Sequence, residues 1–453
     1  VNGVFFNPAS IADSRYRFDF NLVSASTMVA NNKASFNFKN LTQSFDGDKL
    51  ENEFIGTNAG LSTGMVSVDV HGPSLMFNAN NRTALALTTR VRTMANIADI
   101  DGQLAGRLMD DMDNNITYPY SINTNANMRL AVNAWTEFGA SYARIINLSG
   151  VHFLKGGLTL KYLAGAANGY LNISNLKATL NETVTSEAYL QNTTGRINLG
   201  FGGVNVSDIG TKDFTKMEST GFGGDLGLVY EFRPDHIGYS FDYDEAGRHI
   251  NKYKFKVGVA LLDVGNIKYQ RDQTRSGGYD IDITGSERLF LNELSNREID
   301  EYKDYFAAHP QYFTAVAGSN ESSYKVALPT TLQLDLDYNL NRGFYAQLAA
   351  QLPLKKDNDF SSINYTSITF TPRYEGRAFG FYLPVNYNSL TQLNAGVSVR
   401  FGPLFFGSGS LLTAALGNSK QADVHVGLRF GGLHKKKKKQ VEDEDDDLFW
   451  ELF

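Results

Sequence analysis

The chain of 453 residues contains no cysteine, only two tryptophans and no long apolar run. The lack of cysteine excludes disulfides, thiolate metal sites and a lipidated amino-terminal cysteine. No stretch approaches the roughly 18 consecutive apolar residues that a membrane-spanning helix requires. This excludes insertion through helices but not through strands, because the strands of a membrane barrel spread their apolar residues by alternation.

The sequence also lacks the signatures of common active sites. It has no Gly-x-Ser-x-Gly motif, no phosphate-binding loop and no triad spacing, and its seven histidines show no metal-ligand spacing. We therefore predict a protein without enzymatic activity, cofactor or resident metal. Two acidic runs, residues 110–113 and 242–245, offer the oxygen ligands that calcium takes. Neither has the glycine and the spacing of a calcium loop, so solvated loop acids are the favoured interpretation and calcium the weaker one.

Tyrosine, phenylalanine and glycine are abundant, with 23, 31 and 42 residues. This balance suits many short strands and girdles of aromatic residues at two membrane interfaces. The net charge of −6 is mild and argues against a nucleic-acid partner. No basic, apolar signal peptide is visible, so we expect the sequence, which begins at Val1, to be a mature, processed chain.

The strongest pattern is an alternation of apolar and polar residues over residues 328–430. In residues 332–338 the apolar side chains fall on one face of an extended chain, and Asp335 and Asp337 fall on the other. The same pattern recurs in residues 379–387, 393–401 and 423–430. A soluble sandwich would show it too, with the apolar face as its core. These strands run to about ten residues without intervening helices, which favours an all-β, antiparallel, up-and-down transmembrane barrel with a polar interior.

Charged residues on the polar faces of these strands are expected inside the barrel. In lipid each would cost several kcal/mol, so we predict that they line the lumen and pair with one another there. The residues concerned are Asp335, Asp337, Arg373, Glu375, Arg377 and Arg400. We expect their role to be structural rather than that of a selectivity filter.

Loop lengths predict the orientation of the barrel, which we expect to occupy residues 16–432 with about sixteen candidate strands. Tight turns near residues 341–343, 375–377 and 402–403 fall at one end, and longer connections fall at the other. Outer-membrane barrels combine short periplasmic turns with longer outer loops, so we place both termini in the periplasm. Helical spacing predicts helices in two outer loops, over residues 95–113 and 286–308.

The amino-terminal residues 1–15 look too irregular for a strand, and Pro8 would interrupt a ladder. The motif Asn7-Pro8-Ala9, leading straight into a barrel, resembles the FadL-like outer-membrane proteins. Residues 71–77, followed by a hairpin that ends in residues 88–92, resemble an uncharacterised Bacteroidota family of such barrels. The resemblance covers most of residues 1–432. It implies fourteen strands and a luminal hatch formed by Asn7, Pro8 and Ala9, for which an ordinary turn is the alternative.

Beyond residue 432 the pattern changes to blocks of charge. Five lysines, residues 435–439, precede the acidic residues 442–447, and an apolar hexapeptide follows. We expect charge blocks this dense to stay solvated and disordered, with the lysines near anionic headgroups. The hexapeptide resembles short motifs whose aromatic residues anchor in a partner's groove. Its expected contacts are Leu448, Phe449, Trp450, Leu452 and Phe453, and a membrane-surface anchor or an uninvolved tail is the alternative.

Three functions remain open from the sequence. In the first, the barrel is a non-enzymatic accessory subunit of an envelope complex for protein assembly or secretion, docked to a periplasmic or outer-membrane partner through its tail. In the second, it is a FadL-like channel for hydrophobic small molecules, with the hatch as its gate. The third, a barrel enzyme, has the least support. The charged interior favours the subunit, because an apolar ligand needs an apolar route.

Overall fold

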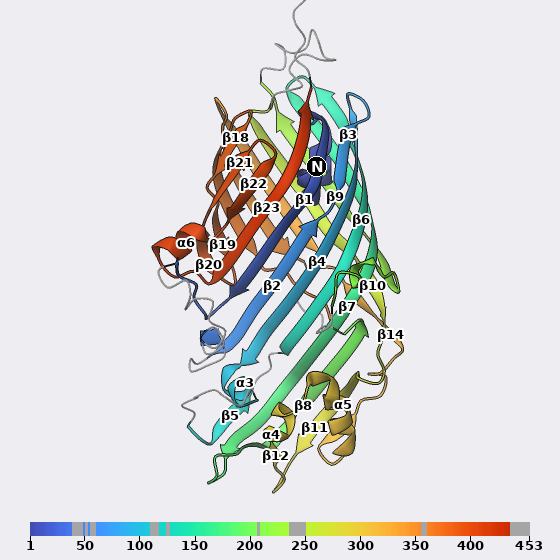
Figure 1. Ribbon diagram of the computed structural model, residues 1–453, viewed down its shortest axis with the longest axis vertical. Coiled ribbons are helices and arrows are strands. Elements are labelled where there is room, and N and C mark those ends of the chain that lie inside the picture. Colours follow the sequence, from blue (N-terminus) through green and yellow to red (C-terminus); the bar gives the residue numbers. More distant parts are fainter. Residues whose placement is uncertain are drawn as a thin grey trace, which may run out of the picture.

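The computed structural model describes most of the chain, namely residues 1–38, 49, 53–54, 60–108, 117–123, 127–205, 209–234, 251–354 and 360–434. Within these ranges the strands form one antiparallel sheet that closes on itself (Figure 1). The first strand, β1 (Tyr16–Asn31), pairs with the last strand, β23 (Gln421–Leu433), from one end to the other. This pairing removes the free edges, as a sheet in a bilayer requires.

The wall has fourteen strand positions, and interrupted strands carry more than one label. In order they are β1; β2 (Leu61–His71) with β3 (Ser74–Asn78); β4 (Thr83–Asp101); β5 (Tyr120–Asn123) with β6 (Met128–Ser149); β7 (His152–Glu182); β8 (Ala188–Gly203) with β9 (Ser219–Phe232); β10 (Phe255–Gln270) with β11 (Gly277–Ile283) and β12 (Leu289–Phe290); β13 (Phe313–Ala315), β14 (Ser323–Ala327) and β15 (Thr331–Asn341); β16 (Phe344–Pro353); β17 (Ser367–Glu375); β18 (Phe379–Tyr382) with β19 (Val385–Asn388); β20 (Gln392–Ala395) with β21 (Val397–Phe401); β22 (Leu404–Ser408); and β23. The predicted closed antiparallel barrel is confirmed, with the smaller of the two predicted strand numbers.

The alternation seen in the sequence separates the two faces of the wall. On β15, Leu336 and Tyr338 point outward and are 44% and 41% exposed, whereas Asp337 between them is 1% exposed. The same holds on β7 and β9, where Leu158, Leu160 and Leu226 are exposed on the outside. This apolar exterior is the face that a barrel presents to lipid. Among the described residues, no helix is long and apolar enough to cross a membrane.

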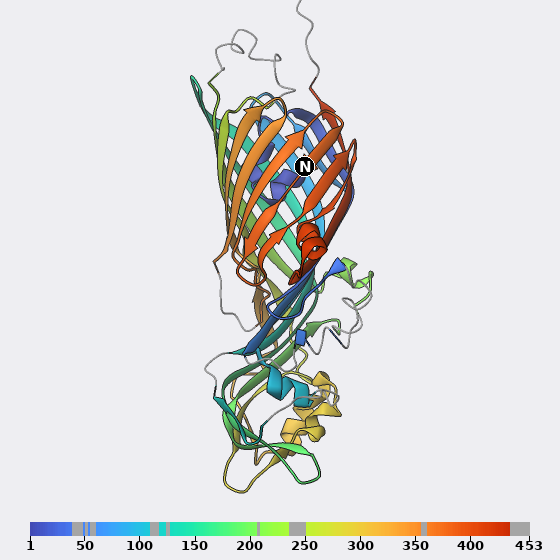
Figure 2. The same cartoon turned by 90° about the vertical axis from the view of Figure 1, so that its left-hand side faces the viewer.

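The wall is much taller on one side than on the other (Figures 1 and 2). β7 has 31 residues and β6 has 22, while β22 has 5; about 9–11 tilted residues cross a bilayer. The surplus forms an extension, with α3 (Gly102–Leu108), α4 (Asn292–Ser295) and α5 (Tyr302–Ala308) packed around a core of its own. The opposite end, which carries the tight turns, is called the short-turn end below.

Both predicted helical loops need correction. The spacing over residues 95–113 predicts a helix, but residues 95–101 continue β4, because they form ladders with β2 and β6 on both sides. Helix α3 begins only after Asp101, whose carboxylate accepts hydrogen bonds from the backbone N–H groups of Gln103 and Leu104 at 3.0 and 3.1 Å. The remaining residues of that loop, 109–113, and the acidic run 242–245 lie outside the described residues.

The second predicted helix, residues 286–308, is broken into pieces. Residues 289–290 pair with β8 as β12, and then α4, a 3-10 helix η7 (Ile299–Glu301) and α5 follow. Glu298 and Glu301 form a reciprocal capping box that starts the second half. The predicted helix is therefore divided: residues 289–290 pair with β8, and a separate helical segment begins after Glu298.

Candidate functional site in the barrel lumen

The amino-terminal segment lies inside the barrel (Figure 2) as two 3-10 helices, η1 (Asn2–Phe5) and η2 (Pro8–Ile11). Pro8 occupies the first position of η2, where its missing N–H leaves no hydrogen bond unmade. Asn7 caps the helix, since its side-chain oxygen accepts a hydrogen bond from the Ala9 backbone N–H at 3.0 Å. The motif Asn7-Pro8-Ala9 thus folds locally into a capped turn, and the turn lies in the lumen.

Asn7 also ties this segment to the wall. Its amide nitrogen donates to the backbone carbonyls of Leu228 on β9 and Val259 on β10, at 3.1 and 3.3 Å. Asn7 is buried, at 3% exposure, and its hydrogen bonds join the backbone of the segment to the backbone of the wall. The predicted placement of Asn7, Pro8 and Ala9 in the lumen is what the structure shows; their action as a gate stays a prediction.

Two glycines of the wall make room for the segment. A Cβ atom added at Gly157 on β7 would lie 2.3 Å from the Ala9 backbone nitrogen, and one at Gly227 on β9 would lie 2.1 Å from the Asn7 side-chain oxygen. No other residue permits so close an approach of backbone to wall. Sequence reasoning missed this fit, although glycine inside a strand is a known signal of close backbone approach.

A network of buried charges fills the lumen beyond the segment. Its members lie on six strands and have side chains no more than 16% exposed: Asp69, Arg90, Arg92, Glu137, Lys161, Asp225 and Asp263. Arg92 contacts Asp263 at 2.7 Å and Glu137 at 3.2 Å, and Lys161 contacts Asp263 at 2.6 Å. Each buried charge therefore has opposite charges beside it, as burial demands.

The amino-terminal segment is seated directly on this network. The centroid of the Phe5 ring lies 4.1 Å from that of the His71 ring and 5.3 Å from the Cζ atom of the Arg90 guanidinium. A cavity of about 10 Å³ is found between Val4, Phe5 and the network, too little for more than one water molecule. The tip of the segment therefore packs closely against the network.

A second segment contacts the inner face of the wall toward the extension. Residues 360–364, in the connection from β16 to β17, fold against the inner face of the wall. Ile363 exchanges two hydrogen bonds with the Asn96 side chain on β4, at 3.0 and 3.1 Å, and the Phe360 carbonyl accepts one from Asn168 on β7 at 3.1 Å. The Phe360 ring packs 4.5 Å from that of Tyr170. These contacts hold residues 360–364 against the inner face of β4 and β7.

Of the charged residues that the sequence predicts in the lumen, some pair with one another and others do not. Asp337 and Arg373 form a two-pronged pair at 2.7 and 3.0 Å, and Glu375 accepts from Arg373 at 2.8 Å. Asp335 lies apart from that pair and accepts from Gln333 at 3.0 Å. Arg400 is also separate and donates to backbone carbonyls at the short-turn end.

The base of the segment carries an ion pair of its own. Asp13, just before β1, lies 2.7 Å from the Arg233 guanidinium and 3.6 Å from the Lys252 ammonium. Burial opposes ionisation of this carboxyl, but the charges of Arg233, Lys155 and Lys252 outweigh it and lower the pKa of Asp13 to about 2. Asp13 is thus ionised at neutral pH and holds the end of the segment to the chain beyond β9.

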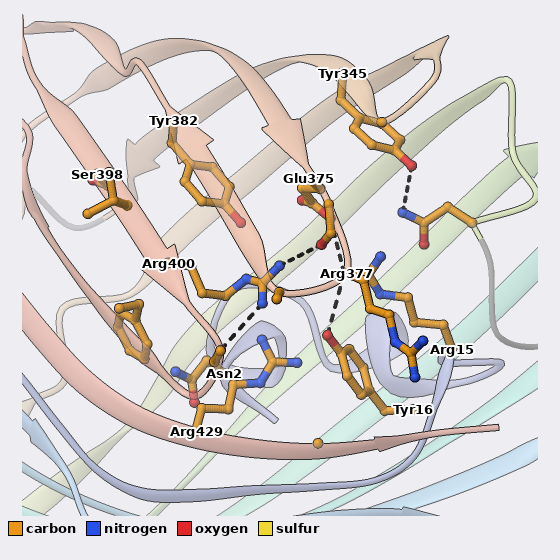
Figure 3. Close-up of a pocket in the computed structure, with 18 of the residues that line it drawn as sticks. Asn2, Arg15, Tyr16, Tyr345, Glu375, Arg377, Tyr382, Ser398, Arg400 and Arg429 are labelled. Carbon is orange, nitrogen blue, oxygen red and sulfur yellow. Dashed lines mark hydrogen bonds and ion pairs between the residues drawn. The ribbon is translucent and has the colours of Figure 1, made fainter. Parts of the chain in front are cut away.

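A cavity of about 1720 Å³ occupies the short-turn end of the lumen. Figure 3 shows Arg15, Arg377, Arg400 and Arg429 pointing into it around Glu375. The predicted luminal residues Glu375, Arg377 and Arg400 therefore meet here. No group of three His, Asp or Glu side chains suited to a metal ion occurs in the part of the chain that the structure describes.

Comparison with solved structures finds bacterial outer-membrane proteins. A FadL homologue of Pseudomonas aeruginosa is 12% identical, covers 94% of this chain and 92% of its own, and has a TM-score of 0.42. The toluene transporter TbuX of Ralstonia pickettii is 10% identical, covers 96% of this chain and 93% of its own, and has a TM-score of 0.41. The toluene transporter TodX of P. putida is 9% identical, covers 96% of this chain and 94% of its own, and has a TM-score of 0.43. At such scores the fold assignment rests on the strand register described above.

Comparison with curated protein sequences finds no match, and the predicted link to a Bacteroidota family stays a prediction. A family model does match, over residues 8–409, which include η2, the charge network and the strands from β1 to β22. The chain therefore belongs to DUF5723, a family of unknown function.

Proposed function

We propose that this protein is an outer-membrane channel for small solutes, with its amino-terminal segment as the gate that closes it in the described state. The observation that carries the proposal is the fit of Asn7 and Ala9 against Gly227 and Gly157. We call the amino-terminal segment, residues 1–15, the plug. A barrel that served only as a support would need no plug fitted to its wall. A barrel of fourteen strands is also wider than the eight-stranded ones whose own side chains fill the interior.

The contacts that hold the plug suit a gate. They include two hydrogen bonds from Asn7, the Asp13–Arg233 pair, the ion pair of the amino terminus with Asp19 and the ring of Phe5 on the network. Each hydrogen bond contributes about 0.5–1.5 kcal/mol net, so the loss of one contact should shift the balance between the closed and open states by a measurable amount.

Conductance of the purified protein in planar bilayers tests this function. Gly157→Ala places a methyl group on the Ala9 backbone, so the plug should be displaced and the conductance should rise well above that of the wild type. Gly417→Ala is the matched control, because its Cβ would meet only the Thr413 carbonyl, at 3.9 Å. Heat-modifiable gel mobility verifies that each barrel is folded. A folded Gly157→Ala barrel with unchanged conductance would contradict the plug.

The accessory-subunit function, with docking through Leu448 to Phe453, concerns residues outside the described part of the chain. Its support is the order of the blocks after residue 432: a charged tether and then an apolar terminus. It is compatible with a channel, because the tail follows the barrel, and we keep it as a separate proposal with its own test in the Discussion.

A further inference from the structure

The cavity at the short-turn end carries an unbalanced positive charge. Five arginines line it, and only two carboxylates, Glu375 and Asp423, do so. Both carboxylates are already engaged: Glu375 by Arg15 and Arg373 at 3.1 and 2.8 Å, and Asp423 by the Ser410 hydroxyl and the Gly409 N–H, both at 2.6 Å. The acids of the cavity are therefore satisfied by neighbours within the protein.

The arginines differ in how they are balanced. Arg15 pairs with Glu375, and Arg429 pairs with Asp19 at 2.7 Å. Arg342, Arg377 and Arg400 form no ion pair with any described residue. Guanidinium groups do not lose their proton in proteins, so three positive charges without an ion-pair partner share the cavity with one carboxylate, Asp423, whose hydrogen bonds come from neutral groups.

Two of these side chains are placed by the turns of the barrel. Arg400 on β21 donates to the carbonyls of Gly376 and Gly402, at 2.9 and 3.3 Å, and so holds two neighbouring turns together. Arg342 lies in the β15–β16 turn with φ of +51°, a left-handed conformation that asparagine and glycine adopt more readily. The side chains of Arg342 and Arg377 are solvent-exposed and line the cavity, where a dissolved anion can reach them.

The chemistry of the cavity matches an oxyanion. The planar fork of arginine binds carboxylate or phosphate through two parallel hydrogen bonds, and the lining adds the hydroxyl groups of Tyr16, Tyr382 and Ser398. Figure 3 shows the side chains of Tyr16, Tyr382 and Ser398 and those of Arg15, Arg377, Arg400 and Arg429 around one shared space. The volume of about 1720 Å³ exceeds the usual 300–1,000 Å³ of a small-molecule site. A small organic anion would fit there together with water.

We propose that this cavity is a binding site for small organic anions that carry carboxylate or phosphate groups. The inference rests on the proposed function only in that the anion would be the solute of the channel. The same carboxylate chemistry occurs in residues 442–447 of this chain, which follow the last described residue, His434, at the rim of the cavity. The test therefore has to separate a free anion from the chain's own acidic residues.

The test is titration calorimetry of the detergent-folded full chain at low salt, with tricarballylate and inorganic phosphate as probes and glycerol as the uncharged control. We expect saturable binding of the anions that weakens as salt is raised. The double variant Arg342→Asn with Arg377→Gln should weaken binding by at least about tenfold, since two charge-assisted bonds are lost. Asparagine suits the turn at residue 342, and Arg400 stays in place to hold its two turns. Arg82→Gln, an exposed arginine outside the cavity in the β3–β4 turn, should bind like the wild type.

A further arm replaces the acids of residues 442–447 by their amides in the full chain. Anion binding that strengthens in this variant supports the site and identifies the tail acids as a competing occupant, whereas unchanged binding assigns the site to the free anion. Equal affinity in the wild type and the Arg342/Arg377 variant overturns the proposal, as does the absence of binding both with and without the tail acids. Binding is measured without conduction, so a failed Gly157→Ala experiment would leave this result standing.

Discussion

The Arg92 guanidinium on β4 lies 2.7 Å from the Asp263 carboxylate on β10, so one ion pair joins the third and the seventh strand of the wall. Both side chains are at most 9% exposed, and Lys161 on β7 reaches the same carboxylate at 2.6 Å. The pair runs through the interior rather than along the sheet. It therefore links parts of the wall that no ladder connects, within the network whose Arg90 lies under the Phe5 ring.

Removal of Asp263 should show what this pair contributes. Asp263→Asn leaves Arg92 and Lys161 without their nearest carboxylate, and breaking a buried pair in this way costs about 3–5 kcal/mol. We expect a loss of this size in the free energy of unfolding, measured by urea titration of the detergent-folded barrel. Asp280→Asn is the control, because its pair with Arg196 is 48–49% exposed and should contribute less than about 1 kcal/mol. Similar small losses in both variants would contradict the role of the network.

The plug should protect its own residues from reagents. A cysteine at Ala9, which is 0% exposed, should react slowly with a bulky impermeant maleimide, and one at Val184, which is fully exposed in the extension, should react fast. Adding Asn7→Ala removes the two hydrogen bonds to the wall, about 2 kcal/mol together, as well as the cap bond within the segment. Labelling at Ala9 should then accelerate by a factor of about 30. Rapid labelling at Ala9 in the parent protein would exclude a closed hatch.

Acid should release the base of the plug only at low pH. The pKa of Asp13 is lowered from its ordinary 3.8 to about 2, so its pairing stabilises the closed state fully above about pH 4 and is lost as the pH falls toward 2. Bilayer conductance should therefore stay constant from pH 8 to pH 5 and rise below pH 4. In Asp13→Asn this part of the acid response should be missing. A rise already between pH 7 and pH 5 in the wild type would point to another group.

The tail should dock through its aromatic end. A buried tryptophan anchor typically contributes about 2 kcal/mol or more, so Trp450→Ala should weaken a partner's affinity about 30-fold while the barrel stays folded. Native pull-downs with the full chain, the Trp450→Ala variant and a chain lacking residues 448–453 measure this effect. Complexes of identical composition in all three would leave the tail without a docking role.

The period-two pattern determined much of the fold before any contact was known. In residues 332–338 it assigned Asp335 and Asp337 to the interior and Leu336 to lipid; in the structure Asp337 is 1% exposed, Asp335 is partly buried and Leu336 is 44% exposed. The assignment succeeds because side-chain alternation is a property of each strand by itself. Helical spacing failed over residues 95–101 for the complementary reason: ladders with β2 and β6 on both sides outweigh a local pattern.

Only the closed barrel decided which of these residues meet. Arg342, Arg377 and Arg400 come from three separate stretches of sequence and share a cavity because their turns lie at one end of a closed wall. Likewise, the sequence alone gives no reason for a glycine at position 157 or 227, in the middle of a strand. The structure gives it, because Ala9 lies against Gly157 and Asn7 against Gly227. Strand periodicity sets the face on which a side chain lies, but contacts across the lumen depend on the closure of the whole sheet and on its strand tilt and register, which no single strand encodes.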